Sequence, residues 1–280
     1  MKIIIRPEFT ERGGHLYSKD VYNALYPLAQ RQSISKNDIY YYDKSYVPQN
    51  GKKYLWTVHH WQNNYTHYNF DRVIKVVTVS QYWATFLKKT YNVDSTIIHN
   101  CYHEDAIQKV RNKDRQSLRD KFGFTDDKVY IYTGLCALGK GIPELIELLK
   151  IPNAIIVTSG KKFMEINTLH FKLEHQDYLD LLKACDIGVF NSIYLEGWHR
   201  VAMECCLVGT PALIKDNAGM GDLLRMSGQM KLDIDNINEQ IPVVLADKEK
   251  YTELGWNGLK HLTYTNFKQQ WLDLYNELNK

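Results

Sequence analysis

Short apolar runs alternate with amphipathic segments along the chain, and polar turns separate them. In the first half, runs of β-branched and aromatic residues predict strands, and apolar residues three and four positions apart predict helices. The predicted strands are residues 2–6, 38–42, 54–58, 73–79 and 96–99, and the predicted helices are residues 16–30, 61–70 and 81–90. The first half therefore has a mixed strand and helix pattern.

A polar stretch over residues 103–127 follows, and its charge-mixed run from Lys109 to Arg119 is interpreted as a solvated linker helix. A second alternating set then begins. Its predicted strands are residues 129–133, 154–158, 169–173, 187–190 and 212–215. Its predicted helices are residues 142–150, 176–184, 201–208 and 247–261, with another near Gly221. A last amphipathic helix carries Phe267, Trp271, Leu272, Tyr275 and Leu278.

Strands that alternate with helices favour parallel sheets covered by helices on both faces. We therefore expect an α/β protein with two Rossmann-like domains that face each other across a cleft. Residues 1–102 would form the first domain and residues 103–264 the second, with a C-terminal helix over residues 265–280 packing back on the first domain. Ligands of such sheets bind beyond the carboxyl ends of the strands.

Composition narrows the class of protein. The chain has 280 residues, 44% of them hydrophobic and 24% charged, which is typical of a globular protein. A net charge of +3 is too small to indicate a nucleic-acid partner. The longest apolar runs fall short of the roughly 20 residues that span a bilayer, and the N-terminal segment reads as a short strand rather than a signal peptide. Five irregularly placed cysteines form no disulfide framework, so a cytoplasmic location is expected.

The most informative segment is Glu-Gly-Trp-His-Arg-Val-Ala-Met-Glu, from Glu196 to Glu204, between a buried strand and a helix. We expect Glu196 at the helix mouth and Glu204 on the same side, about 12 Å along at 1.5 Å per residue. A helix mouth presents unpaired N–H groups that suit a phosphate. Two flanking carboxylates can accept hydrogen bonds from a ribose and a hexose, as in a sugar nucleotide. The alternative is two surface glutamates, but apolar residues surround Glu204, and a carboxylate there needs a partner.

With Glu196-Gly197-Trp198-His199, Glu204 and Gly209-Thr210-Pro211, the second half resembles the family 4 glycosyltransferases, retaining enzymes of GT-B fold that use sugar nucleotides without a required metal. Gly134-Leu135-Cys136-Ala137-Leu138-Gly139-Lys140-Gly141 resembles that family's Gly-Arg-Leu-x-x-x-Lys-Gly, Gly13-Gly14 its first glycine pair, and Thr57-Val58-His59-His60 its Thr-x-His-Asp. The motifs occur in the family's order over nearly the whole chain, although the first domain is short for the family.

The resemblance implies a role for each matching residue. Glu204 would hold the ribose, Glu196 and His59 would contact the donor sugar, and Lys140 would stabilise the leaving diphosphate. Further donor-binding positions are Gly13, Gly14, Gly197, Trp198, His199 and Arg200. The chain departs from the family where Leu135 replaces an arginine, and Arg200 is a candidate to supply that charge. His199 replaces a glycine and Trp198 a phenylalanine, which leaves the sugar open.

We therefore expect a glycosyltransferase that moves a hexose from a nucleoside diphosphate sugar, such as a UDP- or GDP-sugar, to an acceptor hydroxyl. The acceptor is a glycan, a lipid-linked sugar or a protein, and peripheral membrane contact stays open. No cofactor or metal is expected, because His59, His60, His67 and the region of Cys101 lack acidic ligands at suitable spacing. The alternatives are a catalytically inactive sugar-nucleotide or glycan-binding module, which Leu135 favours, and a sugar-nucleotide epimerase of the same architecture.

Overall fold

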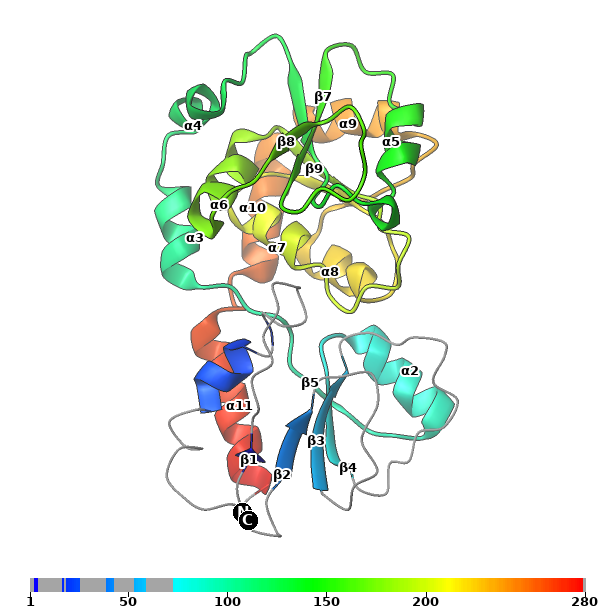
Figure 1. Cartoon of the computed structure of the whole chain (residues 1–280), viewed down its shortest axis with the longest axis vertical. Coiled ribbons are helices and arrows are strands. Elements are labelled where there is room, and N and C mark those ends of the chain that lie inside the picture. Colours follow the sequence, from blue (N-terminus) through cyan, green and yellow to red (C-terminus); the bar gives the residue numbers. More distant parts are fainter. Residues whose placement is uncertain are drawn as a thin grey trace. The chain divides into compact units, whose positions relative to one another are not determined.

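The computed structural model describes residues 3–4, 17, 19–25, 39–42, 53–58 and 73–278. The chain divides into two compact units (Figure 1). Unit 1 combines residues 1–101, 196–198 and 262–280, and unit 2 combines residues 102–195 and 199–261. Unit 1 is therefore built from three separate parts of the sequence.

Unit 1 holds a parallel sheet. Within the described part of the chain, its strands are β1 (Ile3–Ile4), β2 (Ile39–Tyr42), β3 (Lys53–Val58), β4 (Val73–Thr78) and β5 (Thr96–Ile97), hydrogen-bonded in that order. Helix α2 (Gln81–Tyr91) packs Leu87 against Trp56, Val58 and Val76 of the sheet. Its C-cap is Asn92, whose φ of 53° lies in the left-handed region. Residues 19–25 are also helical, inside the helix predicted over residues 16–30.

The last helix, α11 (Tyr264–Leu278), packs within unit 1. Phe267, Trp271 and Leu274 are its buried residues. The ring of Tyr17 meets Phe267 edge-on at 5.2 Å between centroids and Trp271 at 6.3 Å. Leu274 lies on the buried stripe, whereas the predicted positions Leu272, Tyr275 and Leu278 are only half-buried.

Unit 2 holds a six-stranded parallel sheet in the order β11-β10-β9-β6-β7-β8. The strands are β6 (Val129–Tyr132), β7 (Ala154–Ser159), β8 (Leu169–Phe171), β9 (Ile187–Phe190), β10 (Ala212–Ile214) and β11 (Met230–Lys231). The helices are α3 (Glu104–Arg111), α4 (Arg115–Phe122), α5 (Ile142–Leu148), α6 (His175–Ala184), α7 (Arg200–Leu207), α8 (Gly219–Ser227), α9 (Ile237–Ala246) and α10 (Lys248–Leu259). A short 3-10 helix, η1 (Leu138–Lys140), precedes α5.

Alternation along β9 shows how helices cover both faces of this sheet. Ile187 and Val189 join the core cluster to which α5 and α9 also contribute (Figure 1). Gly188, between them, faces the other way, because a Cβ there would lie 2.8 Å from the sulfur of Cys205 on α7. Both faces are thus buried, as expected of a parallel sheet. The predicted α/β class is confirmed.

The interpretation of residues 109–119 as a solvated linker helix is wrong. The segment is divided between α3 and α4, and Arg119 is only 3% exposed. Arg119 and Arg115 both bind the carboxylate of Asp186, at 3.2 Å and 2.6 Å. Because Asp186 lies immediately before β9, the basic run fastens α4 to the sheet rather than facing water.

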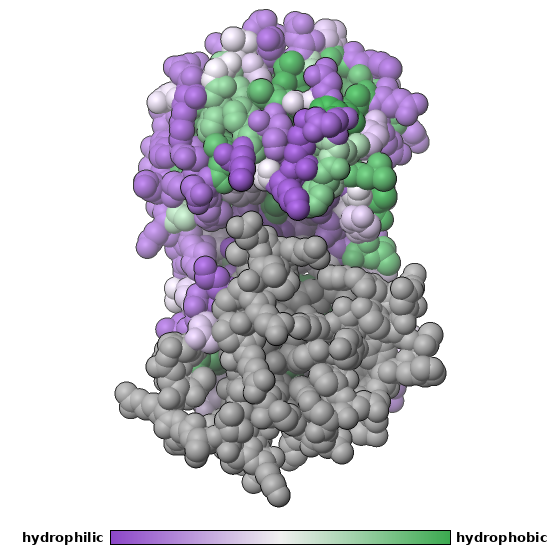
Figure 2. Space-filling model, in the orientation of Figure 1, coloured by the Kyte–Doolittle hydropathy of each residue, from purple (hydrophilic) through white to green (hydrophobic). Residues whose placement is uncertain are grey.

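The surface of unit 2 seen in Figure 2 is mainly hydrophilic, with smaller hydrophobic areas between the polar side chains. All five cysteines are free and buried. Within the part of the chain that the structure describes, no helix is both long and apolar enough to cross a membrane.

Candidate active site

The strand order of unit 2 creates a switch point between β6 and β9. From β6 the chain proceeds to β7 and β8 on one side, and from β9 it proceeds to β10 and β11 on the other. Connections that leave in opposite directions open a crevice beyond the carboxyl ends of the two central strands. The loop with the glycine motif follows β6, and the loop with the two-glutamate motif follows β9. Both motifs therefore begin at the edge where such sheets bind ligands.

Glycines let these two loops touch. Gly141 has a φ of 69°, and a Cβ on it would lie 2.4 Å from the carbonyl oxygen of Asn191. A Cβ on Gly139 would lie inside the ring of Tyr194, 1.8 Å from its nearest atom. Only glycine fits position 141, whereas a side chain at position 139 would require the exposed ring of Tyr194 to move away. Lys140, between the two glycines, is held at this contact.

Hydrogen bonds fix the same contact. The carbonyl of Gly139 accepts from the backbone N–H of Ile193 at 3.0 Å and from the hydroxyl of Ser192 at 3.3 Å. The side chain of Asn191 donates to Glu144 on α5 at 2.6 Å. These hydrogen bonds hold the loop that carries Lys140 against the loop that follows β9.

Helix α7 begins at Arg200, four residues after Glu196. This start lies one residue before the predicted start at residue 201, so Glu196 precedes the helix, as expected. His199 occupies the N-cap position, and its Nδ1 accepts from the backbone N–H of Ala202 at 3.1 Å. A side-chain acceptor at that position satisfies an N–H that the first helical turn cannot pair.

Glu204 is buried on α7, with 4% of its surface exposed. Its Oε2 accepts from the hydroxyl of Tyr178 at 2.9 Å. Its Oε1 lies 3.1 Å from Nε of Arg200 and 3.5 Å from Nε2 of His175. The need for a partner, expected from its apolar neighbours, is met by three side chains.

These partners keep Glu204 charged. Burial acts to raise the pKa of Glu204, but the hydrogen bond from His175 and the charge of Arg200 outweigh it, so the pKa lies below its ordinary value of 4.5. For Tyr178, burial and then the neighbouring charge of Glu204 raise the pKa well above 10.0. The pair therefore consists of a carboxylate and a protonated phenol at neutral pH.

Glu196, Gly197 and Trp198 belong by their contacts to unit 1. The indole N–H of Trp83 donates to the carbonyl of Glu196 at 3.3 Å, and the ring of His99 lies 4.7 Å from that of Trp198. Trp198 is 7% exposed, and its own indole N–H has no hydrogen-bond partner among the described residues.

The remaining predicted site residues, Gly13, Gly14 and His59, lie outside the described residues. Within the ranges that the structure describes, Lys140, His199, Arg200 and Glu204 all belong to unit 2. His199, Arg200 and Glu204 lie at the start of α7 or on it, and Lys140 lies on η1. Those ranges also contain no group of three or more His, Cys, Asp or Glu side chains arranged to hold a metal ion.

Sequence reasoning did not single out Tyr178 and His175. They lie three positions apart on α6, the helix that precedes β9. This spacing places two residues on one face of a helix. Nothing in the local sequence distinguishes that face from an ordinary half-exposed surface, so the only signal was the predicted need of Glu204 for donors.

Residues 114–261, more than half of the chain, match the family described as glycosyl transferases group 1. The chain belongs to the group 1 glycosyl transferases. Among curated proteins, it is 24% identical over 181 residues to a Bacillus subtilis (strain 168) protein named "Putative glycosyltransferase YtcC". That match covers 53% of this chain and 44% of YtcC, so the chain matches less than half of that protein's length.

Solved structures share the fold over nearly the whole chain. Anabaena HepE in complex with UDP-glucose is 14% identical with a TM-score of 0.75, covering 99% of this chain and 99% of HepE. Sucrose-phosphate synthase from Thermosynechococcus elongatus is 14% identical with a TM-score of 0.73, covering 99% of this chain and 98% of that chain. At this identity the likeness shows the fold alone, which is GT-B.

Leu135 is one of the positions at which this group 1 glycosyl transferase departs from the family pattern quoted above. Leu135, in place of the arginine, is half-buried. Its Cδ1 lies 3.3 Å from where a Cβ on Gly160 would be, and Gly160 directly follows β7. The side chain at position 135 thus lies beside the carboxyl end of β7, at the same edge of the sheet as the two motif loops.

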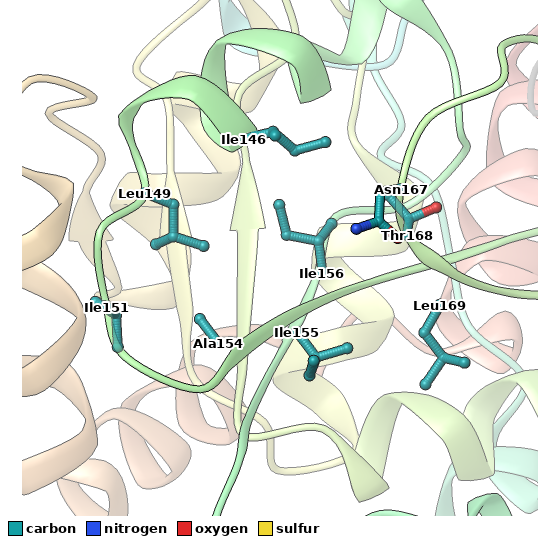
Figure 3. A pocket seen from close by; sticks show the side chains of 9 residues that line it. All are labelled: Ile146, Leu149, Ile151, Ala154, Ile155, Ile156, Asn167, Thr168 and Leu169. Atoms are coloured by element: carbon teal, nitrogen blue, oxygen red, sulfur yellow. The ribbon is translucent and has the colours of Figure 1, made fainter.

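Unit 2 also has a groove that lies apart from the two motif loops (Figure 3). Its lining is aliphatic apart from one amide and one hydroxyl, and comprises Ile146, Leu149, Ile151, Ala154, Ile155, Ile156, Asn167, Thr168 and Leu169. It follows the amino-terminal half of β7, away from the switch-point loops. A groove without a charged side chain does not suit a nucleoside diphosphate, so it is not the candidate site of this glycosyl transferase.

Proposed function

We propose that the chain is a retaining, metal-independent glycosyltransferase of the family 4 type. It transfers a hexose from a nucleoside diphosphate sugar to an acceptor hydroxyl. The family match supports the transferase class. The hexose, the retention of configuration and the absence of a metal rest on the motif resemblance.

The observation that carries this proposal is the buried, anionic Glu204 behind the switch point of unit 2. A carboxylate that is 4% exposed is costly to bury, and here three donors keep it ionised. Such a group suits hydrogen-bond recognition of ribose hydroxyls. The glycine-containing loop after β6, which contacts the loop after β9, suits the close approach of backbone to a diphosphate.

The chemistry we propose depends on placement and charge more than on acid–base catalysis. Lys140 and the amino end of α7 would stabilise the departing diphosphate, with Arg200 as a second cation near it. Glu196 and His59 would orient the donor sugar. Gly13, Gly14, Gly197, Trp198 and His199 would complete the donor site. The indole N–H of Trp198, which has no partner among the described residues, supports a polar ligand atom there.

The acceptor we propose is a glycan, a lipid-linked sugar or a protein-borne hydroxyl. Exposed apolar side chains gather on the two motif loops, where Leu138, Ile193, Tyr194 and Leu195 are 67%, 55%, 62% and 45% exposed. A tyrosine ring can stack on a sugar, and aliphatic neighbours suit an acceptor with apolar parts. These residues support an acceptor of mixed polarity.

The test compares Glu204→Ala with Glu196→Ala. Glu204→Ala should weaken nucleotide binding roughly tenfold or more, because hydrogen bonds to charged groups contribute about 1.5–3 kcal/mol. Glu196→Ala should lower turnover more than affinity. Calorimetry with UDP and GDP, and steady-state rates with a panel of nucleotide sugars, would separate the two effects. Unchanged affinity and unchanged rates in both variants would refute the assignment.

A second candidate is a catalytically inactive sugar-nucleotide-binding module, and Leu135 is the observation that favours it. A panel of nucleotide sugars should raise the melting temperature in either case, since a ligand bound only by the native state stabilises it. Release of free nucleotide distinguishes the two. A tightly bound donor that is never cleaved, with every acceptor tried, would favour the module.

A further inference from the structure

We infer that Tyr178 and His175, both on α6, are positioning residues that set Glu204 to recognise the ribose hydroxyls of the donor, and that they make the site selective for ribonucleotides over 2′-deoxyribonucleotides. This inference rests on the proposed function. It adds a second helix to the candidate site, since α6 carries neither of the motifs that indicated a sugar nucleotide.

The geometry divides the two oxygens of Glu204 between different helices. Tyr178 of α6 donates to Oε2 at 2.9 Å, whereas Arg200 of α7 donates to Oε1 at 3.1 Å. Arg200 precedes Glu204 by four residues on one helix, so this pair alone would leave Oε2 without a partner. Tyr178 therefore fixes the rotation of the carboxylate about its last bond.

The ring of Tyr178 is itself held in place. It lies 6.3 Å from the ring of Tyr132 on β6, and the hydroxyl of Tyr132 is 2.7 Å from Oγ of Ser159 at the end of β7. These contacts connect Glu204 to the carboxyl ends of the two strands that precede the glycine loop and Gly160. The ring contact on one side and the hydrogen bond to Glu204 on the other limit the positions that Tyr178 can adopt.

The direction of the hydrogen bond determines what Glu204 can recognise. Because Tyr178 stays protonated, it donates to the carboxylate rather than competing with it for hydroxyl hydrogens. An ionised carboxylate has about four acceptor positions and donates none. Protein donors occupy three of these acceptor positions. The remaining position can accept a hydrogen bond from a ligand O–H but cannot form one with a C–H.

His175 indicates the side from which a ligand reaches the carboxylate. Its side chain is 53% exposed, against 13% for Arg200, and its 3.5 Å contact with Oε1 is the longest of the three. The weakest and most exposed donor is the one a ribose hydroxyl can most readily replace or join. His175 therefore lies where the ribose would meet Glu204.

The experiment measures sugar selectivity instead of activity. Calorimetry on the full chain would compare UDP with 2′-deoxy-UDP, and GDP with 2′-deoxy-GDP. For the unsubstituted protein we expect the ribonucleotide to bind about tenfold more tightly, as expected for one hydrogen bond to a charged group. In Tyr178→Phe the ratio should fall to about threefold or less. His175→Ala should change the ratio less than Tyr178→Phe does.

Tyr130→Phe is the matched control. Tyr130 is a buried tyrosine of unit 2, and its hydroxyl accepts from the backbone N–H of Thr125, away from Glu204. This variant loses a comparable hydrogen bond and should keep the ribose preference. A ratio that falls equally in Tyr178→Phe and Tyr130→Phe, or in neither, overturns the inference and leaves the proposed function intact. If the unsubstituted protein binds none of the four nucleotides, both fail.

Discussion

Glu204 is a residue whose ionisation should change the stability of the protein with pH. Its pKa lies below the ordinary 4.5, because the donors around it outweigh the effect of burial. A carboxylate with a lowered folded-state pKa adds stability above its unfolded-state pKa, and that stability is lost as pH falls through the folded-state value. Glu204 should therefore contribute fully at neutral pH and progressively less below about pH 4.5.

Glu204→Gln tests this contribution. Gln keeps the shape of the side chain but cannot ionise, so the variant should be less stable at pH 7. The difference in unfolding free energy between the two proteins should narrow as pH is lowered below about 4.5. Chemical denaturation at a series of pH values measures it. A difference that stays constant with pH would contradict the assigned charge.

Leu135 gives a prediction of gained function. Leu135→Arg would place a guanidinium beside the carboxyl end of β7, where the resemblance expects one. One added charge-assisted contact contributes about 1.5–3 kcal/mol, so UDP should bind roughly tenfold more tightly. Leu135→Met, which adds length without charge, should bind UDP as the unsubstituted protein does. Equal affinities in all three proteins would place the diphosphate elsewhere.

At the scale of single residues, the sequence predicted only some features of the candidate site. The apolar run around Glu204 correctly predicted a buried carboxylate with partners, because an unpaired buried charge is unstable. The identity of those partners was not predictable. Tyr178 and Arg200 come from different helices, and Arg119, which looked like one more solvated basic residue, binds Asp186 some 67 positions away in the chain. Contacts of that separation depend on the packing of elements.

At the scale of elements, Gly141 connects η1 to α5 and has a matched counterpart in Gly123. Both have a φ of 69°, which costs a non-glycine residue about 1–2 kcal/mol. A Cβ on Gly123 meets nothing within 4 Å, whereas one on Gly141 would lie 2.4 Å from the carbonyl of Asn191. A substitution at either position therefore carries the same free-energy cost of a positive φ. Only a substitution at Gly141 adds a clash with the backbone of Asn191.

We expect Gly123→Ala to lower stability by about 1–2 kcal/mol and leave nucleotide binding unchanged. Gly141→Ala should cost more and should also weaken binding of UDP, since the loop carrying Lys140 must move away from Asn191. Denaturation and calorimetry on the two variants give both numbers. Equal binding by both variants would mean that this loop does not contact the nucleotide.

Element type was largely predictable because strands and helices differ in their hydrophobic period. The misses have local causes. Helix α9 contains Pro242, and a proline normally argues for a helix end. Strand β11 has two residues, too few to show a period. By contrast, the predicted start of α7 at residue 201 lies within one residue of the observed start at Arg200.

At the scale of the whole molecule, the two units should respond separately to core mutations. Trp271 of α11 is fully buried in unit 1 beside Tyr17. Trp271→Ala should destabilise by about 3–5 kcal/mol, as large core truncations do. Hydrogen exchange should accelerate in β3 and β4 and stay unchanged in β6 and β9.

Trp256→Ala is the companion variant for unit 2, because the guanidinium of Arg111 lies 4.0 Å from the centre of that ring. It should accelerate exchange in α3 and α10 and spare β3 and β4. If either variant accelerated exchange equally in both units, they would unfold as a single cooperative body.

Unit 1 is assembled from separate segments of the chain, and this affects the order in which the protein can fold during synthesis. Its buried aromatic residues include Tyr17 near one end of the sequence and Trp271 near the other. During translation, the ribosome completes every residue of unit 2 before it releases α11. Unit 1 would then reach its native packing only after unit 2 has been synthesised, and its strands, which precede unit 2 in the sequence, would need protection from aggregation until then.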